Sequence, residues 1–423
     1  MLNGRVAREA GFERVFVPAW PGDEGIAMGC AAFALHRLAP PSAFPPRPLA
    51  LRKPSARGSP TQGTMKRSNL IHRRPPPRRA PLGPYQGKRY SDEDVQSTID
   101  EMSPWCEEVE PSELSAKVTP SSSPADAQGE EGVAAGGAAA GGAAVAAAVE
   151  ALARGEVICW FSGRAEVGAR ALGSRCILAD PRRRDMHARV NEVKRREMFR
   201  PLAPSVMAEE VQGWFDGVPP LESSPYMSIT ASVRTERRKD VPAITHVDGS
   251  ARLQSVAGAD APLYYALIAA FFLATGVPLV LNTSFNLAGM PIVETPLDAV
   301  RCFLDAPADL SLLYLQGRLL RRRAFPAPCA ASCPQQEPSF VSRCMADALG
   351  KPRRVEVLVE GRWLQLTDAL ELEVLERCSG GVLMAEIAAE IASEAAEDEG
   401  AMLKAVEARM RHLYELRLVT MQG

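Results

Sequence analysis

The stretch Gly163–Arg182, with the sequence GRAEVGARALGSRCILADPR, places four arginines, two carboxylates and three glycines within twenty residues. Glycine lets the backbone approach a ligand closely, because it has no side chain to hold the ligand away. An arginine fork donates two parallel hydrogen bonds to phosphate or carboxylate oxygens. The stretch therefore predicts an anion-binding pocket with a rigid floor, and a phosphorylated substrate.

The residues before this stretch predict an α/β fold. Small apolar residues favour a helix from near Ala144 to Gly155, and Val157–Phe161 has the composition of a buried strand. The arginine-rich stretch thus begins where a strand ends. Ligands of α/β folds gather at the carboxyl ends of strands, which is where this stretch would lie.

A second apolar region lies farther along the chain. Residues 261–295 carry a single charge, Glu294, but Thr275–Pro278 (TGVP) interrupts them. Each half is too short for the roughly 20 residues that a bilayer crossing needs. We expect a buried helix followed by a buried strand, and no membrane span.

Three further motifs follow the first in order. They are Lys194–Ser205 (KRREMFRPLAPS), Thr245–Gln254 (THVDGSARLQ) and Asn282–Asn286 (NTSFN). Together with Gly163–Arg182 they resemble the signature blocks of the NodU-type O-carbamoyltransferases. The resemblance covers residues 150–320 well, and residues 1–36 and 81–102 more thinly. The pattern differs at two positions, where Ala169 replaces a proline and Cys176 replaces a serine.

The resemblance implies an α/β (α+β) fold with a YrdC-like carbamoyltransferase domain. Such a domain forms carbamoyl-adenylate from carbamoyl phosphate and ATP with Mg²⁺, and the carbamoyl group then goes to a hydroxylated small molecule. A Lys-x-Arg pair and a Ser-x-Asn pair surround the nucleotide in that fold. Here Lys194 and Arg196 match the first pair, and Ser284 and Asn286 match the second.

The matched residues give a set of expected roles. Lys194 places a point charge on a phosphate oxygen, and Ser284 contacts phosphate or Mg²⁺ through its hydroxyl. We expect catalytic roles for Lys194, Arg196 and His246, and nucleotide binding by Lys194, Arg196, Ser284 and Asn286. We expect substrate binding by the following side chains: Arg164, Glu166, Arg170, Arg175, Arg200 and Arg252.

Some of these residues have a second interpretation. His246 lies beside Asp248 and either contacts phosphate or shuttles a proton near neutral pH, or it is a structural hydrogen-bonding residue. Glu166 and Asp180 either contact substrate or neutralise the surrounding arginines, and we favour the neutralising role more strongly for Asp180.

The N-terminal residues resemble only the end of the family's sugar-kinase-like lobe. Asp23 takes the position of a carboxylate that helps to hold Fe or another divalent metal in that lobe. The sequence has no HxxxH pair, and its five histidines are isolated. Because a catalytic metal needs about three protein ligands, we expect an incomplete metal site and a truncated lobe.

Composition and resemblance together predict seven segments. We expect a lobe remnant over 1–38, a disordered basic Pro-rich linker over 39–80, a return segment over 81–118, a flexible Ser/Gly/Ala-rich insertion over 119–143, the YrdC-like domain over 144–323, a linker over 324–350 and a small helical winged-helix-like domain over 351–423. In the return segment, Ser91 should cap a helix that runs through Ile99.

The C-terminal segment predicts a compact unit of its own. Strands over 355–359 and 363–366 precede helices near 367–379, 382–394 and 400–415. The unit resembles the small peptide-binding modules of the PqqD type, so a protein partner for 351–423 is one hypothesis. The alternative to an enzyme is accordingly a truncated, non-catalytic module that binds ATP and carbamoyl phosphate and acts through this unit.

Charge and cysteine content restrict the partners and the compartment. The net charge of −2 does not favour nucleic acid or an anionic membrane, so we expect neither as a partner. Nine scattered cysteines without a CxxC pair, and charged residues at the N-terminus in place of a signal peptide, predict a cytoplasmic protein.

Overall fold

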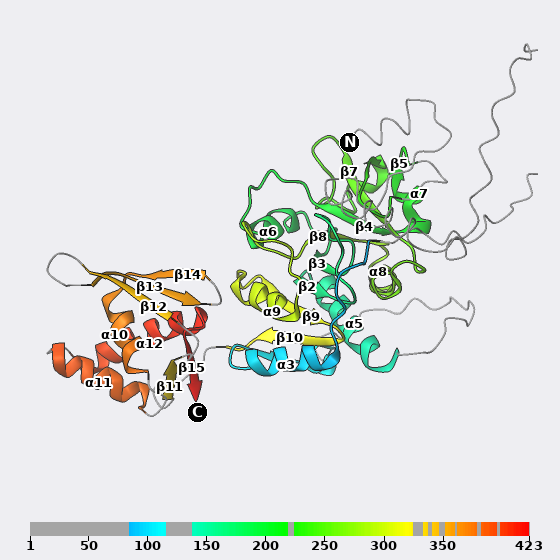
Figure 1. Cartoon of the computed structure of the whole chain (residues 1–423). Coiled ribbons are helices and arrows are strands. Elements are labelled where there is room, and N and C mark those ends of the chain that lie inside the picture. Colours follow the sequence, from blue (N-terminus) through cyan, green and yellow to red (C-terminus); the bar gives the residue numbers. More distant parts are fainter. Residues whose placement is uncertain are drawn as a thin grey trace, which may run out of the picture.

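A computed structural model describes most of the chain from residue 84 onward (Figure 1). The described ranges are 84–115, 138–218, 224–324, 333–336, 341–346, 352–359, 362–378, 382–395 and 398–422. The predictions for residues 1–38, including Asp23, and for the linker 39–80 therefore lie outside the described residues.

A ten-stranded mixed sheet forms the centre of the molecule, in the order β1-β10-β9-β2-β3-β8-β4-β7-β6-β5. Most neighbours are antiparallel, whereas β2 with β9 and β4 with β7 are parallel pairs. The strands are β1 Cys106–Glu108, β2 Val157–Phe161, β3 Arg175–Ala179, β4 Ala203–Met207, β5 Phe215–Asp216, β6 Ile229–Val233, β7 Ser250–Val256, β8 Leu279–Ser284, β9 Leu310–Leu315 and β10 Arg318–Arg322. Every residue of β2, β3 and β4 is buried, so the central strands form the core.

Helices cover both faces of this sheet (Figure 1). α5 and α8 pack on each other and on strands of one face, while α9 packs on β2 and β9 from the other face, next to α3. The helices are α3 Asp92–Met102, α4 Pro111–Ser115, α5 Ala138–Ala153, α6 Met186–Val193, α7 Val211–Trp214, α8 Pro262–Thr275 and α9 Pro296–Asp305. The α/β prediction is thus confirmed at the level of a mixed architecture with one large sheet.

Two predicted elements of this domain are confirmed with their local causes. The Ser91 side chain accepts a hydrogen bond from the Asp94 amide and closes a capping box at the start of α3, which continues to Met102. The apolar region beyond residue 261 forms α8 and then β8. Between them Gly276 adopts φ +74° and ends the helix.

The predicted insertion over 119–143 is wrong at its end, because α5 already begins at Ala138. The sequence AAAGGAA is low in complexity and looks flexible, but alanine has the highest helix propensity of all residues. The helix therefore extends backward through the two glycines. Residues 119–137 lie outside the described part of the chain.

The C-terminal unit contains the predicted strands and helices and, within the described ranges, three strands more. β12, β13 and β14 form one antiparallel sheet, and β11 pairs with β15. The elements are β11 Cys333–Gln336, β12 Val341–Ala346, β13 Pro352–Val359, β14 Arg362–Leu366, α10 Ala369–Arg377, α11 Met384–Ala395, α12 Glu399–Glu415 and β15 Val419–Gln422. The linker predicted over 324–350 is wrong where β11 and β12 lie, because pairing with β15 and β13 orders these segments.

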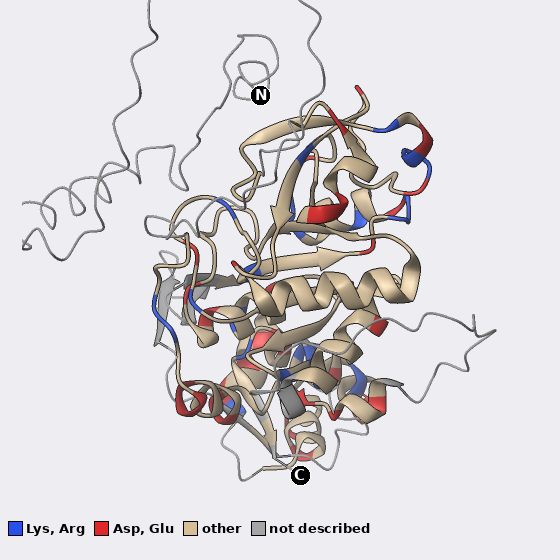
Figure 2. Cartoon of the chain, turned by 90° about the vertical axis from the view of Figure 1, so that its right-hand side faces the viewer, with Lys and Arg blue, Asp and Glu red and all other residues tan. Residues whose placement is uncertain are grey.

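Two contacts join this unit to the large sheet. The Arg417 guanidinium lies 2.9 Å from the Asp305 carboxylate, and the Tyr414 hydroxyl donates to the Pro104 carbonyl. Basic and acidic residues are interspersed along the elements (Figure 2). None of the helices in the described ranges is long and apolar enough to cross a bilayer.

Candidate functional site

The arginine-rich stretch forms an irregular loop between two central strands. It leaves β2 at Phe161 and enters β3 at Arg175. β3 pairs with β8 so that Cys176 lies opposite Ser284. The start of β3 and the end of β8 therefore lie side by side. They meet at the edge of the sheet that is formed by the ends of these central strands.

Lys194 lies at this edge, directly after α6, and joins the two predicted motif pairs. Its ammonium nitrogen donates to the Ser284 carbonyl and lies 3.1 Å from Ser284 Oγ, 2.9 Å from the Asn286 carbonyl and 2.8 Å from Asn286 Oδ1. Ser284 Oγ donates to Asn286 Oδ1 at 2.7 Å. The structure thus brings together three of the four residues predicted to surround a nucleotide.

The environment of Lys194 makes its charge sensitive to pH. The side chain is 4% exposed, and burial lowers the pKa of the ammonium to about 7. The positive charge of Arg196 acts in the same direction. The four oxygen acceptors favour the charged form and hold the amine in place.

Two further arginines, Arg170 and Arg196, act electrostatically on Arg252. Burial, and then the charges of Arg170 and Arg196, lower the pKa of Arg252 to about 10. Arg196 donates through Nε to Asn191 Oδ1 at 2.6 Å, but its buried Nη2 has no hydrogen-bond partner. Within the described ranges, none of the three forms an ion pair with a carboxylate. We call Arg170, Arg196 and Arg252 the arginine cluster, and this arrangement suits an anionic ligand.

His246 lies beside the arginine cluster. Its Nε2 lies 3.3 Å from the Leu202 carbonyl and its Nδ1 lies 3.3 Å from Ser250 Oγ. Burial lowers the pKa of His246, and the charge of Arg252 contributes. The imidazole is therefore neutral at pH 7, and both ring nitrogens have protein partners, which fits the structural interpretation of this residue.

Arg175 has partners that the sequence did not indicate. The side chain is fully buried, stacks on the Phe161 ring at 3.5 Å and donates to the carbonyls of Ser162 at 3.0 Å and Ser174 at 3.1 Å. It also borders the pocket described below. Its guanidinium mainly holds the loop's backbone, so these contacts differ from the predicted contact with substrate.

The other two predicted arginines point elsewhere. Arg164 is exposed and donates to the Gly87 carbonyl at 3.0 Å, and Arg200 is exposed and pairs with Glu197 at 2.6 Å. The structure therefore does not bring either side chain to Lys194. Their predicted substrate contacts remain predictions.

The two carboxylates of the stretch hold protein groups. Glu166 Oε1 accepts hydrogen bonds from the amides of Leu172 and Ser174, both at 2.7 Å, and burial raises the pKa of this carboxyl group. Asp180 pairs with Arg182 at 2.7 Å. The pair with Arg182 agrees with the neutralising role favoured for Asp180, and Glu166 holds the loop through its two backbone hydrogen bonds.

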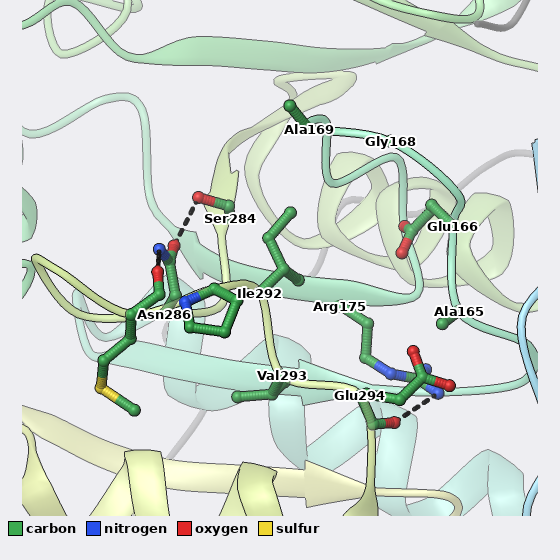
Figure 3. Close-up of a pocket in the computed structure, with 12 residues that line it drawn as sticks. Ala165, Glu166, Gly168, Ala169, Arg175, Ser284, Asn286, Ile292, Val293 and Glu294 are labelled. Atoms are coloured by element: carbon green, nitrogen blue, oxygen red, sulfur yellow. Dashed lines mark hydrogen bonds between the residues drawn. The ribbon is translucent and has the colours of Figure 1, made fainter. Parts of the chain in front are cut away.

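A pocket of about 480 Å³ opens between the loop and β8 (Figure 3). Ser284 and Asn286 lie on one side of it, and Glu166, Arg175 and Glu294 lie on the other. Met290–Val293 supply an apolar wall. The volume lies in the range of small-molecule sites.

Sequence reasoning missed three residues that lie under this site. Ser205, Gln254 and Asn282 are buried polar side chains on neighbouring strands, and all three stand inside the quoted motifs. Their spacing from predicted site residues could have indicated them, because Asn282 lies two residues before Ser284 and Gln254 lies two residues after Arg252. Residues two apart on a strand point to the same face of the sheet.

No group of three or more His, Cys, Asp or Glu side chains in the described ranges could hold a metal ion. The arginine cluster makes the edge positively charged, which disfavours a resident cation. Mg²⁺ fits this site only together with an anionic ligand that supplies oxygen ligands of its own.

Comparisons with known proteins assign the central region. Residues 149–322 match the family model described as carbamoyltransferase C-terminus. An uncharacterized protein of Synechocystis sp., sll1178, is 32% identical over 347 residues, which cover 77% of this chain and 46% of that protein. The nodulation protein NolNO of Sinorhizobium fredii is 45% identical over 175 residues, or 41% of this chain and 25% of that protein.

A third relative has an enzymatic name. The 3'-hydroxymethylcephem-O-carbamoyltransferase of Streptomyces clavuligerus is 40% identical over 151 residues, which cover 36% of this chain and 28% of the enzyme. The chain spans less than half the length of each of these three relatives. The family model covers the residues that build the site, and residues 149–322 of this chain match a carbamoyltransferase C-terminal region of the kind found in the NodU-type relatives.

Proposed function

We propose that this region binds carbamoyl phosphate and ATP and forms carbamoyl-adenylate, which supplies the carbamoyl group for O-carbamoylation of a hydroxylated small molecule. The observation that supports the proposal is the arginine cluster, three guanidinium groups that form no ion pair with a carboxylate within the described ranges, together with the buried amine of Lys194, on which the charge of Arg196 acts. The O-carbamoyltransferase named among the relatives supports the reaction class.

The arrangement suits two phosphorylated ligands because its charges are fixed before binding. Arg170 and Arg196 each repel Arg252, so an anion that binds at Arg252 relieves the repulsion. Lys194 supplies a further charge at the end of β8, beside the Ser284 hydroxyl. Preorganised cations of this kind stabilise negative charge that develops in an acyl-transfer transition state.

The proposed reaction has two steps, cleavage of carbamoyl phosphate and attack of the resulting carbamate on ATP. Water cleaves carbamoyl phosphate to carbamate and phosphate, and a carbamate oxygen then attacks the α-phosphorus of ATP. Pyrophosphate leaves, and the products together are carbamoyl-adenylate, phosphate and pyrophosphate. Lys194 and the arginine cluster hold the phosphate oxygens and neutralise the charge on the leaving pyrophosphate.

Mg²⁺ would accompany the ATP phosphates and neutralise part of their charge. Among the residues of the pocket, the Ser284 hydroxyl is suited to add one oxygen ligand. The protein's own contribution is to orient the phosphates and exclude bulk water from the pocket edge.

The second candidate function is a binding module without turnover. The arginine cluster favours ligand binding under both functions. In the family that the sequence resembles, the N-terminal lobe with its HxxxH pair serves transfer to the acceptor, which is a separate step. Formation of the adenylate does not need that lobe in our proposal, and turnover therefore separates the two functions.

Release of pyrophosphate from ATP, measured on the purified chain with Mg²⁺ and with or without carbamoyl phosphate, tests the proposal. We expect release that depends on carbamoyl phosphate and falls at least about 100-fold in Lys194→Ala and in Ser284→Ala, since each loses charge-assisted contacts. Arg411→Ala on the exposed side of α12 is the matched charge control and should keep the wild-type rate. ATP binding without any release of pyrophosphate would favour the binding module.

A further inference from the structure

Three buried polar side chains connect neighbouring strands beneath the site. Ser205 on β4, Gln254 on β7 and Asn282 on β8 are 0%, 2% and 1% exposed. Ser205 Oγ donates to Gln254 Oε1 at 2.7 Å, and Asn282 Nδ2 donates to Ser205 Oγ at 2.9 Å. We call these three residues the polar frame.

The polar frame holds the arginine-rich loop by its backbone. Asn282 Nδ2 donates to the Ala171 carbonyl at 3.1 Å, and Gln254 Nε2 donates to the Leu172 carbonyl at 2.6 Å. Glu166 holds the Leu172 amide from within the loop. The residues directly after Arg170 are thus fastened at successive carbonyl and amide groups, although they belong to no strand or helix.

The same strands carry the ligand-facing residues. Asn282 and Ser284 are two residues apart on β8, and Arg252 and Gln254 are two apart on β7, so each pair points to one face of its strand. The polar frame therefore holds the loop that carries Arg170 at a fixed position relative to the strands that carry Arg252 and Ser284.

The polar frame opposes an electrostatic repulsion between Arg170 and Arg252. The charge of Arg170 is close enough to Arg252 to lower the pKa of that guanidinium, so the two side chains repel each other when no anion is bound. An exposed loop residue would relieve this repulsion by moving away. Buried hydrogen bonds to the backbone oppose that movement, because breaking them leaves carbonyls without partners.

We propose that Gln254 and Asn282 are positioning residues that hold Arg170 against Arg252 and so set the affinity of the arginine cluster for phosphate groups. This inference rests on the proposed function, since it assigns the cluster to anion binding. Neither side chain needs to touch the ligand. Their effect passes through the carbonyls of Ala171 and Leu172.

Hydrogen exchange tests the positioning separately from activity. In Gln254→Met, which keeps the side-chain volume and removes the hydrogen bonds, we expect the amides of 171–174 to exchange at least about tenfold faster, with unchanged exchange in β2. Gln254→Glu keeps the acceptor for Ser205 and removes the donor to Leu172, and it should act similarly. Ser224→Ala is the matched control, because Ser224 is equally buried but bonds to the Leu253 carbonyl and the Ile229 amide.

Binding of inorganic pyrophosphate, measured by calorimetry, provides the second readout. We expect the Kd to rise about tenfold in both Gln254 variants and to stay unchanged in Ser224→Ala. In the enzymatic assay, the KM for carbamoyl phosphate should rise about tenfold with little change in kcat.

The outcomes separate the two proposals. Wild-type exchange and wild-type pyrophosphate affinity in the Gln254 variants would overturn the positioning role. So would unfolding of both variants while Ser224→Ala folds, since the frame would then serve stability alone. If the wild-type chain binds no pyrophosphate, the proposed function fails, whereas faster exchange confined to the loop would still support the frame.

Discussion

At the scale of single residues, Lys194 combines a buried amine with four oxygen acceptors. Desolvation favours loss of the proton and the acceptors favour keeping it. The result is a pKa of about 7, so the charge of the site changes near neutral pH. Charge at the phosphate-binding edge and stability of the fold then depend on pH in opposite directions.

The first prediction concerns this pH dependence. The pKa of Lys194 is about 7 in the folded chain and about 10.4 in the unfolded chain. Between these values the unfolded state binds more protons, so this residue makes the fold more stable as pH rises from about 7 to about 10. Pyrophosphate affinity should fall over the lower part of the same range, because the ammonium loses its charge.

Calorimetry and denaturant unfolding between pH 6 and 10 check both trends. Lys194→Arg is the control, since arginine keeps its charge throughout and the ligand titrates identically in both proteins. Equal pH profiles for wild type and Lys194→Arg would contradict the assignment.

Removal of a charge from the arginine cluster should stabilise the fold and weaken the binding of anions. Arg170→Gln removes one of the repelling charges, so we expect the free energy of unfolding to rise by about 0.5 kcal/mol while pyrophosphate affinity falls about tenfold or more. Arg411→Gln removes the same charge from α12 and should weaken no binding. A destabilised Arg170→Gln with normal affinity would speak against an anion site.

At the scale of elements, the arginine-rich loop depends on close backbone approach at Gly173. Gly173 adopts φ +122°, and a Cβ atom placed there would lie 2.4 Å from the Tyr264 ring on α8. The Trp160 indole also donates to the Gly173 carbonyl at 2.9 Å. The loop can pass between β2 and α8 only because this position has no side chain.

We therefore expect Gly173→Ala to destabilise the fold by about 3 kcal/mol, from backbone strain together with overpacking against Tyr264. Gly276→Ala is the comparison, because Gly276 also has positive φ but no atom within 4 Å of the added Cβ. That change should cost only about 1 kcal/mol. Guanidinium unfolding of the two variants measures the difference, and equal losses would show that contact with Tyr264 adds nothing.

The elements also show what sequence could and could not predict. α3, α8 and β8 were predictable because a capping residue, a glycine stop and an apolar run are local signals. β11 and β12 were not, since distant strands order them. In the site, the family resemblance indicated Lys194 with Ser284 and Asn286, whereas the partners of Arg175 depend on where the loop's carbonyls lie.

At the scale of the whole molecule, the C-terminal unit contacts the end of α9, next to Arg195. Arg417 pairs with the Asp305 carboxylate at the end of α9, and the Asp305 carbonyl accepts from Arg195 at 2.7 Å. Arg195 lies between Lys194 and Arg196 in the chain. A change in how this unit packs would therefore shift the backbone at Arg195, and with it the neighbouring side chains of Lys194 and Arg196.

Arg417→Ala should show the strength of this connection. The pair is 7% and 17% exposed, so removal of one partner leaves a buried charge and costs about 3 kcal/mol of stability. Arg409→Ala breaks the more exposed pair with Asp368 and should cost less than about 1 kcal/mol. Thermal unfolding compares the two, and equal small losses would mean that the two units are only loosely joined.

The most direct test of the central claim is exchange of labelled pyrophosphate into ATP, because it requires adenylate formation and needs no acceptor. With carbamoyl phosphate present, the account predicts exchange in the wild-type chain, none without carbamoyl phosphate, and loss in Lys194→Ala and Ser284→Ala. If ATP and pyrophosphate bind but carbamoyl phosphate elicits no exchange, this region does not form carbamoyl-adenylate.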